Sequence, residues 1–367
     1  MKILGIESSC DECAAAVVED GRRVLSNVVA SQIPFHAAYN GVVPEIASRK
    51  HTEWIYAVAR EALDRAGLDV RGVEGVAVTS RPGLLGSLLV GLSFAKAFAW
   101  ARKIPFIAVD HMLAHLYASR LVLPGTPAED RGGEGPPVEY PFLGLLVSGG
   151  HSIICRVDDF DDISVLGATI DDAVGEAFDK VAAFYGMGYP GGAVIDRLAK
   201  NGDSGAFEFP MPNLYKKDRQ GALHPYDVSY SGLKTAVINQ LEQFRAGGPG
   251  AKEGNGGAIP ARPRVEDIAA SFQKTAVEIL LRSLFRAAED TGLDTVVAGG
   301  GAAANSLLRA RLADRKELRC IFPPVELCGD NGAMIAGIGY HYLIRGETSP
   351  MNITPQARVA GFKRKYP

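Results

Sequence analysis

The sequence has few cysteines, no long hydrophobic run and little excess charge, and each shortage excludes a class of protein. Its 367 residues include five cysteines. So sparse and odd a set is typical of reduced thiols rather than of a disulfide-stabilised secreted domain. We find no signal-peptide pattern and no run of about 18 uncharged apolar residues, so we expect a cytoplasmic protein without a membrane span. A net charge of -3 argues against a protein built mainly for unaided nucleic-acid binding.

Several well-defined motifs are also missing. No segment has the G-x-x-x-x-G-K-[ST] pattern, which argues against a P-loop nucleotide site. Cys10 and Cys13 form a single C-x-x-C without a second pair, and chance explains such a pair more often than a metal or redox site. His111 and His115 have the H-x-x-x-H spacing of a zinc protease, but Met112 stands where that motif needs a glutamate base.

What the sequence does have is enough length and apolar content for two lobes, and an internal repeat. Hydrophobic residues make up 47% of the chain. Three short extended segments separated by turns occur near the start and again near the middle, and strand–helix units follow each set. This alternation predicts two α/β lobes. The predicted extended segments are residues 2–7, 14–19, 23–30, 142–147, 153–157 and 163–167, and glycine- and proline-rich insertions are expected at 124–141 and 246–263.

The sharpest local feature is the histidine pair. Histidines four residues apart lie on one helix face, so His111 and His115 can bind one metal ion. Their helix follows a predicted strand that ends at Asp110, and open α/β sheets bind ligands at this end of their strands. Asp330, at a predicted helix start, is the best candidate for a third ligand. The alternatives are a pair of partly exposed helix histidines and an Asp330 that only caps its helix.

Glycine-rich turns predict a nucleotide site. The turn Ser148–Gly150 joins two strands of the second meander, and Ser8–Glu12 takes the same place in the first. Main-chain N–H groups in such turns can approach phosphate oxygens closely. Gly299–Gly301, running on to Asn305, separates a strand from a helix and is suited to a nucleoside. Each turn alone could be an ordinary hairpin, but their equivalent places in a repeat favour a shared site.

Two acidic residues on predicted helices are candidates for the same site. Asp179 and Asp196 could accept hydrogen bonds from ribose hydroxyls, as acidic residues often do. The residues alone leave open an equally good alternative, in which both are surface carboxylates.

The motifs together resemble one family. In order, from about residue 3 to 340, they are GIESSCDE, HMLAH, LLVSGGHS, the run from DDAVGEAFDK to YPGG, YSGLKTAV, GGGAAAN and CGDNGAMIA. The sequence is similar to the TsaD/Kae/Gcp family, whose members make N6-threonylcarbamoyladenosine in tRNA, and it resembles the bacterial branch. The family was once described as an O-sialoglycoprotein endopeptidase, because of the histidine pair.

The resemblance implies the two-lobed fold of actin, Hsp70 and hexokinase. We expect residues 1–112 to form the first lobe, completed by a C-terminal helix at about 330–367, and residues 113–329 to form the second. The resemblance also implies one divalent metal ion, Fe2+ or Zn2+, on His111, His115 and Asp330. Contacts to the adenylate substrate are implied for Leu146, Val147, Ser148, Gly149, Gly150, Asp179, Gly192, Asp196 and Asn305.

The implied reaction is an acyl transfer. The donor is threonylcarbamoyl-AMP, and the acceptor is N6 of adenosine 37 in tRNAs that read codons starting with A. AMP is released, and the family implies TsaB and TsaE as protein partners. Asp11 is our hypothesis for the proton acceptor. The GGGAAAN and CGDNG motifs each differ by one residue from the commoner family pattern, and the two insertions make alignment there uncertain.

Two other functions stay open on the sequence alone. One is a metal-dependent glycoprotease, which the missing glutamate disfavours and which a cleavage assay on a glycoprotein would reveal. The other is an ATPase or sugar kinase of the same fold, which would need no two-histidine metal site and would show ATP turnover without partners.

Overall fold

A computed structural model describes residues 1–39, 41–126, 138–212, 224–245 and 264–359, with the backbone alone for 241–245. Most of the predicted insertion at 124–141 and all of that at 246–263 lie outside the described residues. None of the helices in the described part of the chain is long and apolar enough to cross a membrane.

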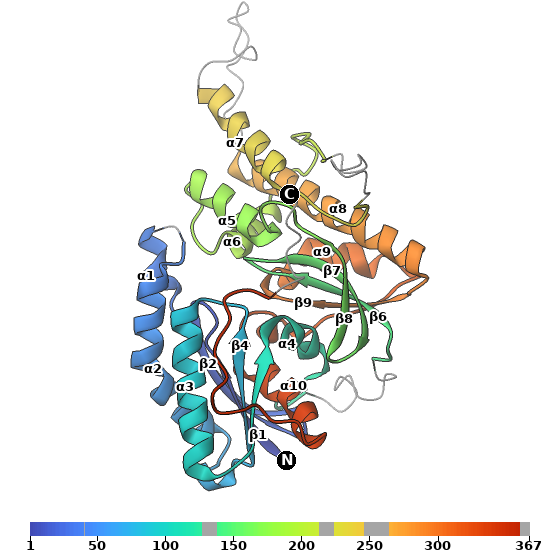
Figure 1. The fold of residues 1–367 in the computed structure, drawn as a ribbon. Helices are drawn as coiled ribbons and strands as arrows, with labels where there is room; N and C mark the ends of the chain where they lie inside the picture. The colour runs from blue at the N-terminus through green and yellow to red at the C-terminus, as the bar shows by residue number, and fades with distance from the viewer. Residues whose placement is uncertain (40, 127–137, 213–223, 246–263, 360–367) are drawn as a thin grey trace, which may run out of the picture.

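Two five-stranded sheets with the same strand order form the framework (Figure 1). The orders are β3-β2-β1-β4-β5 and, read from the opposite edge, β8-β7-β6-β9-β10. In each sheet three antiparallel strands precede two parallel ones, which confirms the predicted repeat and the two-lobed α/β fold. The strands are β1 (Lys2–Glu7), β2 (Glu12–Glu19), β3 (Arg23–Ser31), β4 (Gly75–Arg81), β5 (Phe106–Asp110), β6 (Phe142–Val147), β7 (Ser152–Asp159), β8 (Asp162–Ala168), β9 (Thr295–Gly299) and β10 (Arg319–Ile321).

Helices cover both faces of the first sheet. Successive side chains of β1 point to opposite faces, so Leu4 and Ile6 pack against α2 (Pro44–Arg65) and α3 (Leu85–Arg102), while Ile3 packs against α10 (Gly332–Ile344). A sheet buried on both faces needs apolar residues on both sides of each strand, which these strands supply. The short helix α1 (Ile33–His36) precedes α2.

The C-terminal helix is shorter than predicted. It ends at Ile344, because Gly346 takes a left-handed conformation with φ of 79° and the chain turns away. The following residues run beside β5, where the N–H of Ser349 donates to the carbonyl of Phe106 over 2.8 Å. Further on, the N–H of Gln356 donates to the carbonyl of Ser80.

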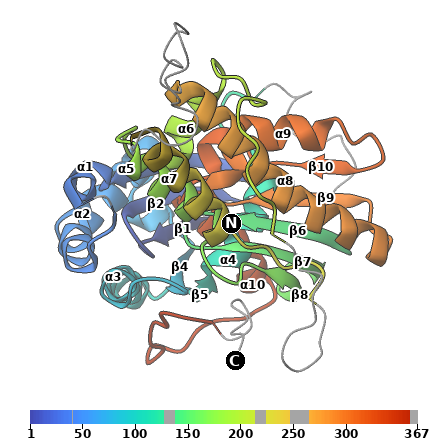
Figure 2. The same ribbon diagram turned by 90° about the horizontal axis from the view of Figure 1, so that it is seen from above.

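In the described residues, the helices of the second half cover one face of the second sheet, and a short helix packs against its other face, between the two sheets (Figure 2). The short helix α4 (His111–Tyr117) packs against α10 and β5 on one side and against β6 and β9 on the other. The predicted lobe boundary, between residues 112 and 113, falls within α4. The helices of the second half are α5 (Val174–Phe184), α6 (Gly191–Ala199), α7 (Ser231–Arg245), α8 (Val265–Thr291) and α9 (Ser306–Ala313).

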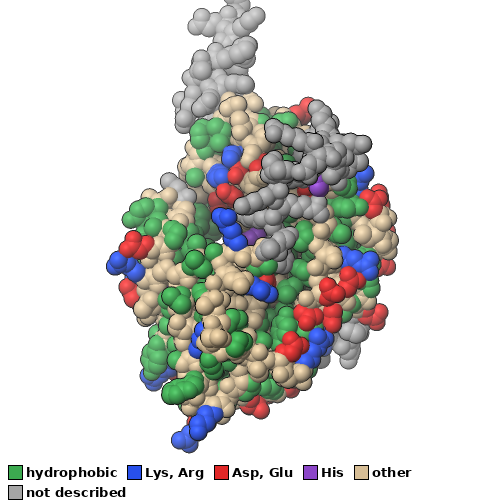
Figure 3. Space-filling model, viewed as in Figure 1, with side chains coloured by type: hydrophobic (Ala, Val, Ile, Leu, Met, Phe, Trp, Pro, Cys, Tyr) green, Lys and Arg blue, Asp and Glu red, His purple; other side chains and the backbone are tan. Residues whose placement is uncertain are grey.

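The face of the molecule drawn in Figure 3 shows no large field of one charge among the described residues. On the face in Figure 3, basic and acidic side chains are interspersed with hydrophobic ones, in keeping with the small net charge. Any contact with a polyanion through this face would therefore be local.

Candidate metal centre and nucleotide-binding turns

The end of β5 fixes the start of the histidine helix. Asp110 caps α4, and its carboxylate accepts hydrogen bonds from the N–H groups of Met112, over 2.8 Å, and Leu113, over 3.4 Å. Arg81 contacts the other oxygen of Asp110 at 3.2 Å. Since α4 begins directly after the strand, His111 and His115 project from its first two turns toward the loop before α10.

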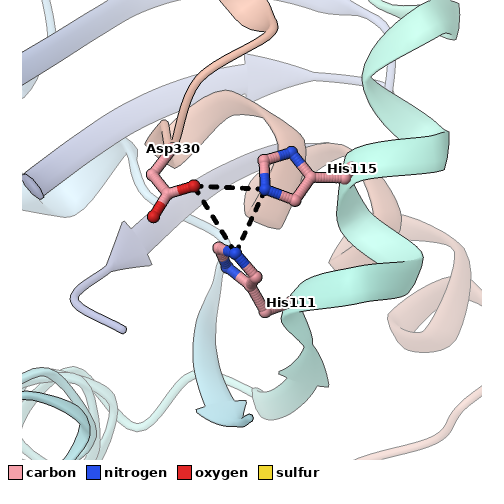
Figure 4. Close-up of side chains that lie close together, drawn as sticks. All are labelled: His111, His115 and Asp330. Carbon is pink, nitrogen blue, oxygen red and sulfur yellow. Dashed lines mark hydrogen bonds and ion pairs between the residues drawn. The ribbon is translucent and has the colours of Figure 1, made fainter. Parts of the chain in front are cut away.

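His111, His115 and Asp330 form a compact cluster that could hold a metal ion (Figure 4). The two histidine Nε2 atoms are 3.1 Å apart. One oxygen of Asp330 lies 3.1 Å from Nε2 of His115 and 3.5 Å from Nε2 of His111. Two imidazoles and one carboxylate are a ligand set that suits Zn2+, and also Fe2+ in the two-histidine, one-carboxylate arrangement. The cluster therefore fits a divalent metal without specifying which one.

Both simpler interpretations of these three residues are wrong. His111 is 8% exposed and His115 is 1% exposed, so they are not surface histidines of a helix. Asp330 does not cap α10, because the cap is Asn331, whose side chain accepts from the N–H of Met334 over 2.9 Å. The carboxylate of Asp330 is thus left to face the histidines.

Charges within the cluster are strongly coupled. Burial alone would lower the pKa of His111, but the carboxylates of Asp330 and Glu7 raise it to about 9. Burial and the charge of His111 lower the pKa of His115. Burial alone would raise the pKa of Asp330, but the two histidines hold it below its usual value. Perturbed pKa values in one cluster of side chains are typical of a functional site.

The glycine turn between β6 and β7 has free space over its two glycines. The N–H of Ser148 donates to the carbonyl of His151 over 2.8 Å, which closes the hairpin. A methyl group added to Gly149 or Gly150 would meet no atom of the described residues within 4 Å. A ligand oxygen can therefore reach the main-chain N–H groups there.

The back of this turn is packed tightly by two further glycines. A methyl group on Gly175, in α5, would lie 2.6 Å from the carbonyl oxygen of Ser148. Gly300, with φ of 91°, follows β9, and a methyl group there would collide with the carbonyl of Val147. Two separate segments, α5 and the residues after β9, thus hold the turn in place through glycine contacts. The side chains of Leu146 and Val147 are buried, so only their backbones could face a ligand.

The remaining predicted substrate residues are gathered around α6. Asp179 accepts a hydrogen bond from the N–H of Gly191 over 2.7 Å, beside Gly192 at the start of this helix. Asp196 accepts from the hydroxyl of Ser306 over 2.7 Å and from its N–H over 3.0 Å. That contact ties α6 to the start of α9, where the side chain of Asn305 caps the helix over 3.0 Å.

The β1–β2 turn brings acidic groups toward these residues. The charge of Asp11 helps to raise the pKa of Asp179, after burial, so the two carboxylates are within electrostatic range. Burial, together with the charges of Asp11 and Asp330, raises the pKa of Glu12 to about 9. Glu12 is therefore within electrostatic range of both Asp11 and Asp330, and Asp179 in α5 is within range of Asp11.

Sequence reasoning missed one carboxylate of this site, Glu7. It ends β1 and touches His111, with its oxygen 3.1 Å from Nδ1. The only sequence signal was a charged residue at the end of an otherwise apolar strand, directly before a polar turn. Met112, which replaces the protease glutamate, is 1% exposed and packs in the core.

The two sheets of the same strand order define a two-lobed protein of the actin, Hsp70 and hexokinase fold class. Two solved structures share this fold at 14% identity. Component A of (R)-2-hydroxyglutaryl-CoA dehydratase from Acidaminococcus fermentans has a TM-score of 0.51 and covers 94% of this chain and 99% of its own. Full-length HypF has a TM-score of 0.55 and covers 93% of this chain and 55% of its own. At this identity the likeness shows the fold alone.

Sequence comparison identifies the family. The TsaD family, described as tRNA N6-adenosine threonylcarbamoyltransferase, matches residues 23–337. Proteins of that name are 61% identical in Treponema denticola, over all of this chain and 99% of the relative, and 54% identical in Treponema pallidum, over all of this chain and 95% of the relative. The chain therefore belongs to the TsaD family of tRNA-modifying transferases, which confirms the predicted family and enzyme class. Neither the protease nor the kinase alternative is favoured.

Proposed function

We propose that this enzyme uses threonylcarbamoyl-AMP as donor and N6 of adenosine 37 as acceptor, in tRNAs that read codons starting with A. The N6 amine attacks the carbamoyl carbon, and the new C–N bond replaces the C–O bond to the phosphate. AMP leaves with both bonding electrons, and the amine loses one proton. The observation that carries the proposal is the metal cluster between two sheets, one of which presents an open glycine turn.

We assign metal binding to His111, His115 and Asp330, with Fe2+ or Zn2+ as the ion. Once bound, the ion would supply a Lewis acid for donor oxygens. The protein's own contribution is to hold the three ligand atoms within 4.8 Å of one another in a buried place. That spacing demands little rearrangement when an ion enters.

The donor would lie between the glycine turn and α6. Main-chain N–H groups of Gly149 and Gly150 would stabilise negative charge on the departing AMP, since the N–H of Ser148 already donates to the carbonyl of His151. Asp179 and Asp196 would accept from hydroxyls, and Gly192 and Asn305 would line the nucleoside. Since one oxygen of Asp196 already accepts from Ser306, its contact would use the other oxygen. Asp11, on the opposite turn, is our proposal for the proton acceptor.

We further propose that TsaB and TsaE are the protein partners and that the enzyme works in the cytoplasm. The lobe division stands as a proposal too, with residues 1–112 and the C-terminal helix in one lobe and 113–329 in the other. Support comes from the packing of α10 on β1 and from contacts of α4 with both sheets.

Nucleoside mass spectrometry tests the activity. The protein, its partners, threonine, bicarbonate, ATP and the separate adenylate synthase are incubated with a tRNA that reads a codon starting with A. We expect threonylcarbamoyladenosine in that tRNA and none in a matched transcript with guanosine at position 37. A complete mixture that leaves the adenosine unmodified would refute the proposal.

A further inference from the structure

Glu7 is a fully buried carboxylate at the end of β1, with 0% of its surface exposed. A buried carboxylate is costly unless donors surround it, so its partners indicate why it is kept. The N–H of Ser9 donates to one oxygen over 2.6 Å. The hydroxyl of Thr79, on the neighbouring strand β4, donates to the other oxygen. That second oxygen also lies 3.1 Å from Nδ1 of His111.

The contact with His111 decides which ring nitrogen is free. An ionised carboxylate only accepts hydrogen bonds, so the Nδ1 that faces Glu7 must carry a proton. In the neutral ring, which is the form that binds a metal, Nε2 of His111 then has its lone pair available, and it points at Nε2 of His115 and the carboxylate of Asp330. Ser9 also approaches Nδ1, at 3.4 Å, but a hydroxyl can donate or accept and does not select a tautomer.

The two histidines of the cluster differ in this respect. Nδ1 of His115 is buried and has no hydrogen-bond partner among the described residues, whereas Nδ1 of His111 has Glu7. Only one ligand ring is therefore anchored from behind by a charged group. A carboxylate behind a histidine ligand fixes its orientation and strengthens it as a donor.

We propose that Glu7 is a positioning residue that holds His111 in its metal-binding tautomer and orientation. The inference rests on the metal site of the proposed function and extends it to a residue on a different strand. Through its contacts with β4 and the β1–β2 turn, Glu7 also locks the ligand ring to the first sheet. It touches neither donor nor acceptor and acts through His111.

The decisive variant is Glu7→Gln, which keeps the size of the side chain. Its amide nitrogen must replace one oxygen, so it faces either the N–H of Ser9 or the shared site of Thr79 and His111. In the second case His111 is driven to the tautomer with a proton on Nε2, where the metal should bind. We expect Zn2+ or Co2+ affinity, measured by competition with a chromophoric chelator, to fall about 10- to 100-fold.

Thr79→Val is the matched control, because it removes a donor to the same Glu7 oxygen without touching His111. We expect its metal affinity to stay close to wild type even where its melting temperature falls. Equal losses of affinity in the two variants would show a general packing defect and overturn the proposal. So would a Glu7→Gln protein that binds metal as tightly as wild type.

A double-mutant comparison separates the positioning role of Glu7 from a general loss of stability. In a His111→Ala background, we expect Glu7→Gln to leave the residual metal affinity unchanged, since the ring it positions is gone. A further fall of 10-fold or so in that background would contradict the proposal. Failure of the proposed function would be distinct, because the tRNA assay would then yield no product with the wild type while the affinity ratio still reports on Glu7.

Discussion

The first and second halves of the molecule have the same strand order but opposite chemistry at equivalent turns. The β1–β2 turn lies beside the carboxylates of the buried Glu7 and the half-buried Glu12, and its Ser9 hydroxyl lies 3.5 Å from Asp330. The β6–β7 turn instead presents two glycines with free space above them. The first half therefore presents side chains at this turn, and the second half presents its main chain.

Under the proposed function, this difference follows from what each half would bind. A metal ion needs electron-pair donors at fixed positions, which buried and mutually hydrogen-bonded side chains supply. A phosphate needs N–H groups without side chains in front of them, which glycine supplies. A duplicated fold thus provides two equivalent places, and the local sequence decides which kind of ligand each place accepts.

The largest expected effect comes from removing the metal ligands of the first half. The double variant His111→Ala with His115→Ala should lose bound metal, measured by elemental analysis, and transfer should fall at least about 100-fold. The fold should stay intact, because α4 keeps its Asp110 cap and its apolar contacts. His224→Ala is the control and should keep both metal and activity. Full activity in the double variant would eliminate the metal role.

The next effect separates open glycines from packed ones in the second half. Gly149→Val should raise the KM for the donor while the melting temperature stays near wild type, because its side chain would enter free space. Gly300→Ala should lower the free energy of unfolding by about 1–3 kcal/mol, since its φ of 91° and the nearby Val147 carbonyl do not accommodate a side chain.

Thermal unfolding together with donor titration checks this pair. If Gly149→Val unfolds as early as Gly300→Ala, the free space over the turn is not real. If it binds donor normally, the turn is not the phosphate site.

Elements of the fold could be predicted from the sequence where the signal for them lies within a short stretch of residues. The bounds of β5 and β6 were predicted correctly, because each is a continuous apolar run with polar residues at its end. β7 extends beyond the prediction at both ends, where polar residues still pair with neighbouring strands. The three-residue strand β10 was not predicted, since pairing with β9 alone defines it.

The site residues also divide into those with a local sequence signal and those without one. The histidine pair could be predicted because its spacing is a local helical pattern, and Asp330 because it stands at a helix start. Glu7 could not, because its role depends on a contact with His111 across 104 residues. Tertiary packing alone decided that Asn331, rather than Asp330, caps α10.

A moderate effect is expected from the pH dependence of Asp179. Burial raises its pKa to about 6 from an ordinary 3.8, so the folded protein binds more protons than the unfolded chain between these values. Its contribution to the free energy of unfolding therefore falls as pH rises from about 4 to 6. Asp179→Asn has no charge to bury, so we expect it to be more stable than wild type above this range and to bind donor with less pH dependence.

Chemical denaturation and donor titration at several pH values test this expectation. A variant whose stability advantage does not grow as pH rises would show that the carboxylate is not penalised by burial. A donor affinity that falls equally with pH in both proteins would assign the dependence to another group.

The smallest effect compares the two asparagine caps, one in each half of the site. Asn331→Ala and Asn305→Ala each remove a side-chain cap, so each should lower the free energy of unfolding by about 1 kcal/mol. Their ligand effects should differ. Asn331 also donates to the carbonyl of Gly329 over 2.8 Å, next to Asp330, so its loss should weaken metal binding. Asn305→Ala should weaken donor binding and leave metal affinity unchanged. If both variants weakened the binding of the same ligand equally, the assignment of metal binding to one cap region and donor binding to the other would be wrong.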